Sequence, residues 1–365
     1  MKHKEPIALF LIGAILSGII TVGASEAGSV ADPLIALNWL KETFLPGAVS
    51  EAEKRADEKL EEVGNQLIAS NAQGTEFRVK RSDILWLESG SSLTALAGTL
   101  SLASGSRGAA VDLTAGVEIT PESGSVAVGH RYLAAENSRV SFSVDSATAV
   151  IRCSGSYQLE PSGETDYNAL AEALKIMGLF RGSDVPFGSG YDLESVPTRI
   201  QGLVMFLRLI GEEQGALNYP GSGITFADVP EWAVPYVAYA YDKGYTKGQE
   251  VDSQWRVVFG SDQPLAARDY VTFLLRALEH AEGTAFTWEN AISDAQRLGV
   301  LTEGEVRLLD GEPFLRAQVA YLSYMSLSAQ MAGETGTLLD KLTESGVVSA
   351  AAAHAAMEGI GGQRK

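Results

Sequence analysis

Residues of the types that most often carry catalysis or bind metals are scarce in this sequence. The chain has 365 residues but one cysteine, Cys153, and four histidines, His3, His130, His280 and His354. One thiol allows no internal disulfide and no thiolate zinc cluster, and no His-x-x-x-His or Cys-x-x-Cys spacing occurs. Sequences typical of phosphate-binding loops and nucleophile elbows are missing as well. We therefore expect no catalytic residue, no metal site and no cofactor.

The thiol and the carboxylates suggest no catalytic arrangement either. Cys153 continues an alternation of apolar residues from Ile151, which is typical of the buried face of a strand. The neighbouring acids Glu212 and Glu213 would diverge around a helix end rather than face each other. Glycoside hydrolysis needs two facing carboxylates, and the sequence singles out no such pair. We predict that the protein is not an enzyme, with a hydrolase as the least favoured alternative.

Composition and charge restrict the partners. Lys and Arg total 28 against 46 Asp and Glu, so the formal net charge is −18, which disfavours nucleic acid and anionic membranes as partners. An apolar share of 45% with 20% charged residues excludes disorder throughout. The length predicts two or three domains.

The N-terminus has the layout of a secretory signal. Residues 1–4 are basic, residues 7–22 form an apolar run, and Ala24 ends a small-residue sequence that suits signal peptidase. Residues 1–24 are therefore predicted to be a signal peptide. An uncleaved anchor is the alternative, because the run is close to the roughly 18 residues that a spanning helix needs. We expect a secreted protein that meets the membrane through this segment before cleavage.

The periodicity of apolar residues changes along the rest of the chain. Residues 28–74 have helical spacing, whereas residues 75–160 alternate with a period of two and contain frequent turn residues. The alternation predicts an all-β domain, either a sandwich or a short solenoid. Residues 161–165 are polar and suit a linker, and helical spacing returns from residue 166.

The helical half contains three similar units, at about residues 166–211, 226–280 and 286–328, followed by a tail over residues 331–365. In the central unit a helix opens after Phe226-Ala227-Asp228-Val229 and ends at Gly244-Tyr245-Thr246-Lys247-Gly248. A second helix then opens at Ala267-Arg268-Asp269. The first unit repeats this order clearly, and the third repeats it weakly.

At these residues the chain resembles the S-layer homology modules of bacterial surface proteins. The units of that family read Phe-x-Asp-Val, helix, Gly-(Ile/Tyr/Leu)-x-x-Gly, loop, then Thr-Arg-Ala-Glu and a second helix. Such modules form a pseudo-threefold helical prism and bind pyruvylated secondary polymer of the Gram-positive cell wall. The resemblance implies an α+β multidomain protein in which a helical segment and an all-β domain precede an all-α, three-repeat helical prism.

The resemblance also implies a polymer-binding set. Arg199, Arg268 and Arg316 occur at the start of each second helix, where a planar guanidinium suits the carboxylate of a ketal. The central unit adds four further candidates, Asp228, Trp232, Gly244 and Gly248. The sequence departs from the family pattern where Gln201, Tyr270 and Gln318 replace its Glu, and Gly304 comes later than the second Gly of a module.

Each of these residues also has a purely structural interpretation. Thr198 with Gln201 forms a capping box, and Asp228 before a proline is typical of a helix start. Glycines such as Gly244 end helices in a left-handed turn, and a repeated aromatic such as Trp232 or Trp288 usually fills the core between stacked units. For the three arginines, ligand contact and internal pairing remain equally open.

The function that follows is non-enzymatic. We expect a secreted cell-surface protein that is bound non-covalently to the bacterial cell wall through degenerate repeats and a pyruvylated glycan. The alternative is a module that has lost polymer binding and contacts other surface proteins instead. A wall-directed hydrolase is the least favoured reading.

Overall fold

The structure is a computed structural model that describes residues 49, 54, 74–120, 124–221, 223–310, 313–357 and 364–365. The predicted signal peptide, residues 1–24, lies outside the described residues, and so does almost all of the predicted helical segment 28–74. The chain divides into two units, residues 1–73 and 74–365. All the strands and helices named below lie in the second unit.

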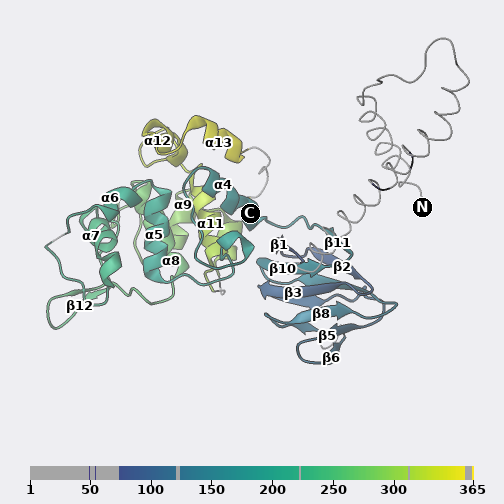
Figure 1. The fold of residues 1–365 in the computed structure, drawn as a ribbon. Coiled ribbons are helices and arrows are strands. Elements are labelled where there is room, and N and C mark those ends of the chain that lie inside the picture. The colour runs from purple at the N-terminus through teal and green to yellow at the C-terminus, as the bar shows by residue number, and fades with distance from the viewer. Residues whose placement is uncertain are drawn as a thin grey trace, which may run out of the picture. The chain divides into compact units, whose positions relative to one another are not determined.

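Two antiparallel sheets occupy residues 75–160 of the described chain (Figure 1). The first has the strand order β1 (Thr75–Lys80), β10 (Thr148–Ser154), β3 (Ser92–Ala97), β8 (Arg131–Ala134), β5 (Ala110–Asp112) and β6 (Val117–Ile119). The second has the order β11 (Tyr157–Glu160), β2 (Ile84–Glu88), β9 (Arg139–Val144), β4 (Leu100–Leu102) and β7 (Ser125–Val126).

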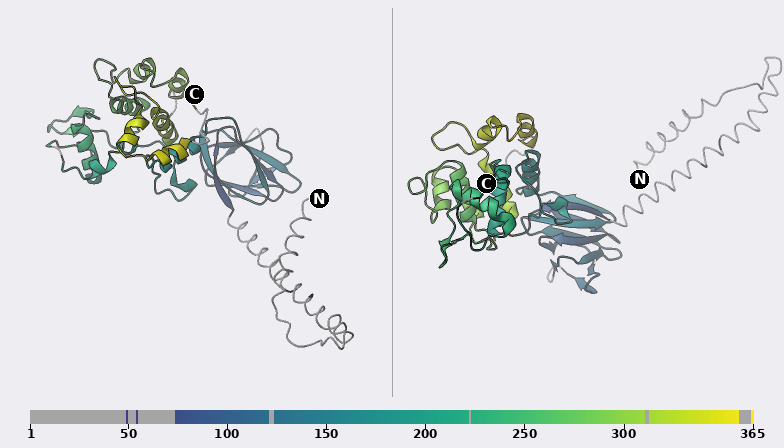
Figure 2. Two further views of the ribbon diagram at one scale, coloured as in Figure 1. Left: turned by 90° about the horizontal axis from the view of Figure 1, so that it is seen from above. Right: turned by 60° about the vertical axis from the view of Figure 1, so that its left-hand side comes forward.

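The two sheets share one apolar core and form the layers of a sandwich (Figures 1 and 2). Phe142 on β9 is fully buried from one sheet, and Ile151 on β10 is fully buried from the other. The alternation along β9 explains this, because residues of the same parity point to the same face of a strand. The antiparallel pairing in both sheets favours a sandwich over a solenoid, whose neighbouring strands run parallel.

Helices follow from residue 167 onwards. The chain forms α4 (Tyr167–Ile176), α5 (Arg199–Leu209), α6 (Glu213–Leu217), α7 (Val234–Asp242), α8 (Ala267–Ala277), α9 (Ala291–Arg297), α10 (Glu303–Leu308), α11 (Arg316–Ser326), α12 (Leu338–Glu344) and α13 (Ala350–Met357). The short 3₁₀ helices are η2 (Gly188–Gly190) and η3 (Glu231–Ala233). The predicted capping box is confirmed at α5, where Thr198 and Gln201 bond reciprocally with each other's backbone amides.

The prediction of an all-α, three-repeat prism over residues 166–330 is wrong. The central predicted unit contains a two-stranded sheet, β12 (Glu250–Val251) and β13 (Val257–Val258). Two β-branched residues favour the extended conformation of β13. The Asp252 carboxylate closes the turn before it by accepting hydrogen bonds from the amides of Gln254 and Arg256, both at 2.9 Å.

Helices continue beyond residue 330, in the segment predicted to be a tail. Leu338 and Leu342 of α12 and Ala353 of α13 belong to the same hydrophobic cluster as the earlier helices. Helix α10, which falls inside the weak third unit, has no counterpart in the predicted repeat. The described residues of α12 and α13 therefore pack into this core, because their apolar side chains are buried there.

The strands and helices of residues 74–365 meet at the edge strand β1. Arg78 on β1 donates hydrogen bonds to the Asn168 side chain of α4 (2.6 Å) and to the Gly188 carbonyl of η2 (3.0 Å). It also forms an ion pair with Glu194, and both side chains are nearly buried. A charged contact of this kind, shielded from water, is a specific connection between the sandwich and the helices.

Candidate functional site

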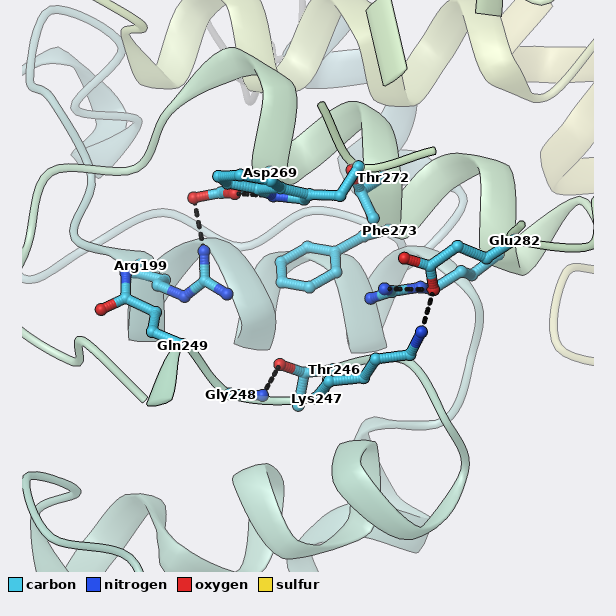
Figure 3. A pocket seen from close by; sticks show the side chains of 11 residues that line it. Arg199, Thr246, Lys247, Gly248, Gln249, Asp269, Thr272, Phe273 and Glu282 are labelled. Carbon is cyan, nitrogen blue, oxygen red and sulfur yellow. Dashed lines mark hydrogen bonds and ion pairs between the residues drawn. The ribbon is translucent and has the colours of Figure 1, made fainter. Parts of the chain in front are cut away.

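A pocket of about 320 Å³ lies between the start of α5, helix α8, the loop that follows α7 and the segment that follows α8. The described residues that line it are Arg199, Thr246, Lys247, Gly248, Gln249, Asp269, Thr272, Phe273, Arg276, Glu282 and Trp288. In the view of Figure 3, the Arg199–Asp269 pair lies on one side of Phe273 and the Lys247–Glu282 pair on the other. The pocket therefore has an apolar floor between two charged walls.

Asp269 organises the first wall. Its carboxylate forms an ion pair with Arg199 and accepts a hydrogen bond of 2.8 Å from the indole nitrogen of Trp288. The residues Arg199 and Asp269 are 7% and 8% exposed, so little solvent screens this pair. The Arg199 guanidinium also lies over the Phe259 ring at 5.1 Å. Its buried Nε has no hydrogen-bond partner among the described residues, which leaves one donor unused.

Glu282 organises the second wall. Its carboxylate accepts hydrogen bonds from Lys247 (2.7 Å) and Arg276 (2.8 Å). Burial of Glu282 opposes its ionisation, but the hydrogen bonds from Lys247 and Arg276 outweigh burial and lower the pKa of this carboxyl. The Lys247 side chain is 70% exposed, so its ammonium group remains accessible to a ligand.

The loop between the walls depends on two glycines. Gly244 follows α7 with φ of +76°, and the next amide, that of Tyr245, donates to the Ala240 carbonyl at 2.7 Å. Gly248 has φ of +74°, and a Cβ atom there would lie 2.4 Å from the side chain of Val257. Arg276 fixes the loop by donating to the Tyr245 carbonyl at 2.6 Å. Both predicted glycines therefore shape the pocket through the backbone.

The charge of this pocket differs in sign from that of the whole chain. Among the described residues that line it, three are cations (Arg199, Lys247 and Arg276) and two are carboxylates (Asp269 and Glu282), which leaves one excess positive charge. This is a local reversal in a chain with a net charge of −18. Trp288 is 40% exposed, and its indole offers an apolar face next to the charged groups.

The two other candidate arginines have different surroundings. The Arg268 guanidinium lies over the Trp288 ring at 3.8 Å and does not itself line the pocket. Arg316 is 5% exposed and donates to the carbonyls of Tyr191 (3.4 Å) and Arg181 (3.3 Å). Burial lowers the pKa of Arg316, with the neighbouring Asp192 opposing the shift. Arg316 therefore contributes to the core rather than to the pocket.

Asp228 and Trp232 lie outside the pocket. The expected role of Asp228 at a helix start is wrong, because its carboxylate accepts three amide hydrogen bonds from the loop before α8. The donors are Phe259 (2.7 Å), Gly260 (2.6 Å) and Ser261 (3.1 Å). Trp232 is 58% exposed and contacts Tyr236 edge-on, so the core position suggested for it is also wrong.

Sequence reasoning missed the residues that hold the arginines in place. Arg276 and Glu282 match no motif position, and Asp269 stands where the family pattern has Ala, yet each pairs with a charged side chain of the pocket. The spacing of Arg276 and Glu282 across the end of α8 carries no recognisable local pattern. Asp269 itself offered a usable sign of the pairing. It is an acidic residue directly after Arg268, on a helix that also has an apolar face.

Other chemistry finds no support in the described part of the chain. No group of three His, Cys, Asp or Glu side chains there could hold a metal ion. Cys153 is 1% exposed, and burial raises the pKa of its thiol to about 12. None of the helices in these residues combines the length and apolar character of a membrane-spanning segment.

Comparisons with known proteins identified no relative of this chain. No protein-family model matches the chain, and no curated protein matches its sequence. The resemblance to S-layer homology modules therefore stays a prediction that depends on the motif residues alone.

Proposed function

We propose that this protein is secreted, is held non-covalently at the bacterial cell surface, and binds a carboxylated wall glycan, such as a pyruvylated secondary polymer, in the pocket between Arg199 and Lys247. The observation that carries the proposal is the combination of three cationic side chains and an exposed indole in one pocket of an acidic protein. The leader over residues 1–24 supports secretion.

The pocket offers separate contacts for the two parts of such a ligand. The guanidinium of Arg199, which lines the pocket, and the accessible ammonium of Lys247 can donate charge-assisted hydrogen bonds to a carboxylate. The indole of Trp288 can pack against a sugar ring, with its orientation fixed by the hydrogen bond to Asp269.

Co-sedimentation with purified wall sacculi tests the proposal. The mature protein should be retained by sacculi that carry their secondary polymer and should be released when the polymer is removed chemically. Lys247→Glu and Trp288→Ala should each lower retention about tenfold, because each removes one charged or stacking contact. Equal retention of the wild type on intact and stripped sacculi would contradict polymer binding.

Lys341→Glu provides the matched control. Lys341 pairs with Glu279 at 2.6 Å on the surface, as Lys247 pairs with Glu282 at 2.7 Å, but it does not line the pocket. The charge change is identical in the two variants. Lys341→Glu should therefore be retained like the wild type, which separates a pocket contact from general repulsion by the anionic wall.

A protein partner at the cell surface is the second candidate, and an exposed aromatic supports it. Trp255 is 89% exposed beside β13, and Val251 on β12 is 57% exposed. The turn that carries Trp255 is held by the Asp252 carboxylate, so the indole is presented by a defined backbone. Exposed aromatics are enriched at protein interfaces. This candidate would be favoured if stripped sacculi retain the wild type but do not retain the Trp255→Ser variant.

A further inference from the structure

A second arrangement of charges, made of residues that do not line the pocket, surrounds Glu305 on α10. The Glu305 side chain is completely buried, with 0% exposed. Its carboxylate accepts hydrogen bonds from the Thr302 amide at 2.7 Å and from the Tyr321 hydroxyl at 3.2 Å. Burial, with Glu305 adding to the effect, raises the pKa of Tyr321, so this phenol keeps its proton to donate. A buried carboxylate of this kind requires a positive partner.

Arg364 supplies that partner from 59 residues further along the chain. Its Nε donates to one oxygen of Glu305 at 3.1 Å, and a terminal nitrogen donates to the other at 3.3 Å. The same terminal nitrogen donates to the Val300 carbonyl at 2.9 Å. A planar guanidinium can satisfy three acceptors placed in this way, whereas an ammonium cannot match the fork.

The next residue is held through its backbone. The Lys365 amide donates to the Tyr321 hydroxyl at 2.8 Å, and its carbonyl accepts from the Thr302 hydroxyl at 2.6 Å. Thr302 and Tyr321 thus contact both the Glu305 carboxylate and the incoming segment. The site therefore binds one arginine side chain and the backbone of the residue that follows it.

Gly304 provides an independent sign that this site accommodates the segment. A Cβ atom at Gly304 would lie 2.7 Å from the Lys365 carbonyl carbon and 3.1 Å from its oxygen. Gly304 is not among the residues with positive φ, so the helix itself does not require glycine here. Glycine weakens a helix relative to alanine. Its presence in α10 is explained by the space that the Arg364–Lys365 segment occupies.

We propose that Glu305, Tyr321, Thr302 and the Val300 carbonyl form an arginine-recognition site for an Arg-Lys peptide, filled in this protein by its own residues Arg364 and Lys365. The segment behaves as a tethered ligand that closes over α10 and α11. Lys365 also pairs with Glu164 at 3.1 Å, so the docked segment connects these helices to the residues just before α4.

Peptide binding to the full chain carrying Arg364→Ala tests the proposal. This variant frees the site, so acetyl-Gly-Gly-Gln-Arg-Lys-amide should bind it saturably by calorimetry and raise its Tm. The same peptide with citrulline in place of arginine should bind at least about tenfold more weakly, since it keeps the shape and loses the charge. Wild-type protein should bind the peptide at least about tenfold more weakly than the variant, because its own Arg364 competes. Equal binding of the two peptides, or no binding, would overturn the proposal.

Gly304→Ala gives a second measurement that does not remove a charge. Alanine favours the helix but blocks the approach of Lys365, so trypsin should cleave after Arg364 at least about tenfold faster than in the wild type. Gly215→Ala is the matched control, because Gly215 lies in helix α6 and a Cβ atom there would lie 3.6 Å from its nearest neighbour, Tyr239, which is an ordinary contact. This variant should be cleaved like the wild type. Unchanged cleavage of a folded Gly304→Ala variant would overturn the proposed contact.

Discussion

The sandwich and the helices use buried charge in different ways. In the sandwich, Asp83 accepts hydrogen bonds from the backbone amides of Lys80 (3.0 Å) and Ser162 (2.7 Å), and Asp112 from those of Thr114 (2.9 Å) and Ala115 (3.0 Å). These carboxylates organise turns. Among the helices, buried charged side chains such as Arg199 and Asp269 pair between separate elements. Charges that join elements can also line a pocket, as Arg199 and Asp269 do.

The largest effect should come from the sandwich core. Phe142→Ala removes a fully buried ring, so the free energy of unfolding should fall by about 3–5 kcal/mol. Chemical denaturation followed by circular dichroism measures this. The folded variant should still be retained by wall sacculi, because Phe142 lies in the sandwich core and does not line the pocket. If the folded Phe142→Ala variant is not retained, wall binding depends on the sandwich as well as on the helices, which would contradict the contrast between the two regions.

Two ion pairs, one among the helices and one in the sandwich, test the contrast in how the two regions use charge. Asp269→Asn leaves the buried Arg199 without its counter-charge, so the unfolding free energy should fall by about 3 kcal/mol. Glu88→Gln in the sandwich breaks a pair with Arg139 whose side chains are 52% and 44% exposed, and it should cost less than about 1 kcal/mol. Similar losses in the two variants would contradict the proposed difference in burial.

The two regions should share one pH dependence of stability. Bonds from Lys80 and Ser162 outweigh the burial of Asp83 and lower its pKa, and bonds from Lys247 and Arg276 do the same for Glu282. A lowered folded pKa stabilises the protein above the unfolded value, and the stabilisation is lost as the pH falls through the folded value. The stability difference between the wild type and Asp83→Asn or Glu282→Gln should therefore shrink below about pH 4. Urea denaturation at a series of pH values measures it.

The same pair of variants should differ in ligand binding at neutral pH. Glu282→Gln releases Lys247 and Arg276, so an anionic glycan should bind up to about fivefold more tightly. Asp83→Asn should leave this affinity unchanged, because Asp83 contacts a turn of the sandwich. Calorimetric titration compares the two. Weaker binding by Glu282→Gln would contradict the cationic role of this wall.

A small effect should follow from changing the thiol. Because Cys153 is buried and its pKa is raised to about 12, it should react with a disulfide reagent at pH 8 after unfolding and hardly before. Cys153→Val, which is of similar size, should change the unfolding free energy by less than about 1.5 kcal/mol. Rapid reaction of the native protein would place Cys153 outside the sandwich core.

Local patterns in the sequence predicted much of the secondary structure. The alternation of Val140, Phe142 and Val144 predicted a strand with one buried face, and all three side chains are buried on β9. Helix starts and ends were also readable, because the Thr198–Gln201 capping box and Gly244 act within one or two turns of chain. These features depend on neighbours in sequence.

Features that depend on distant partners were not predictable in this way. Asp228 resembles a helix cap, but the amides that it binds come from residues 31 to 33 positions later. Arg199 and Arg316 both occur at the start of a second helix of a predicted unit. Arg199 lines a pocket, whereas the guanidinium of Arg316 donates hydrogen bonds to two backbone carbonyls. The packing of α12 and α13 likewise depends on which apolar surface the earlier helices leave uncovered. Periodicity predicts an apolar face without naming its partner.

The most direct test of the account is calorimetric titration of the mature chain with a pyruvylated glycan fragment and with the same fragment after removal of its pyruvate. We expect the pyruvylated glycan to bind at least about tenfold more tightly, because a carboxylate can accept from Arg199 and Lys247. Arg199→Lys, which keeps the charge beside Asp269 but loses the planar fork, should remove most of this difference. Equal affinity of the wild type for the two fragments would contradict the account.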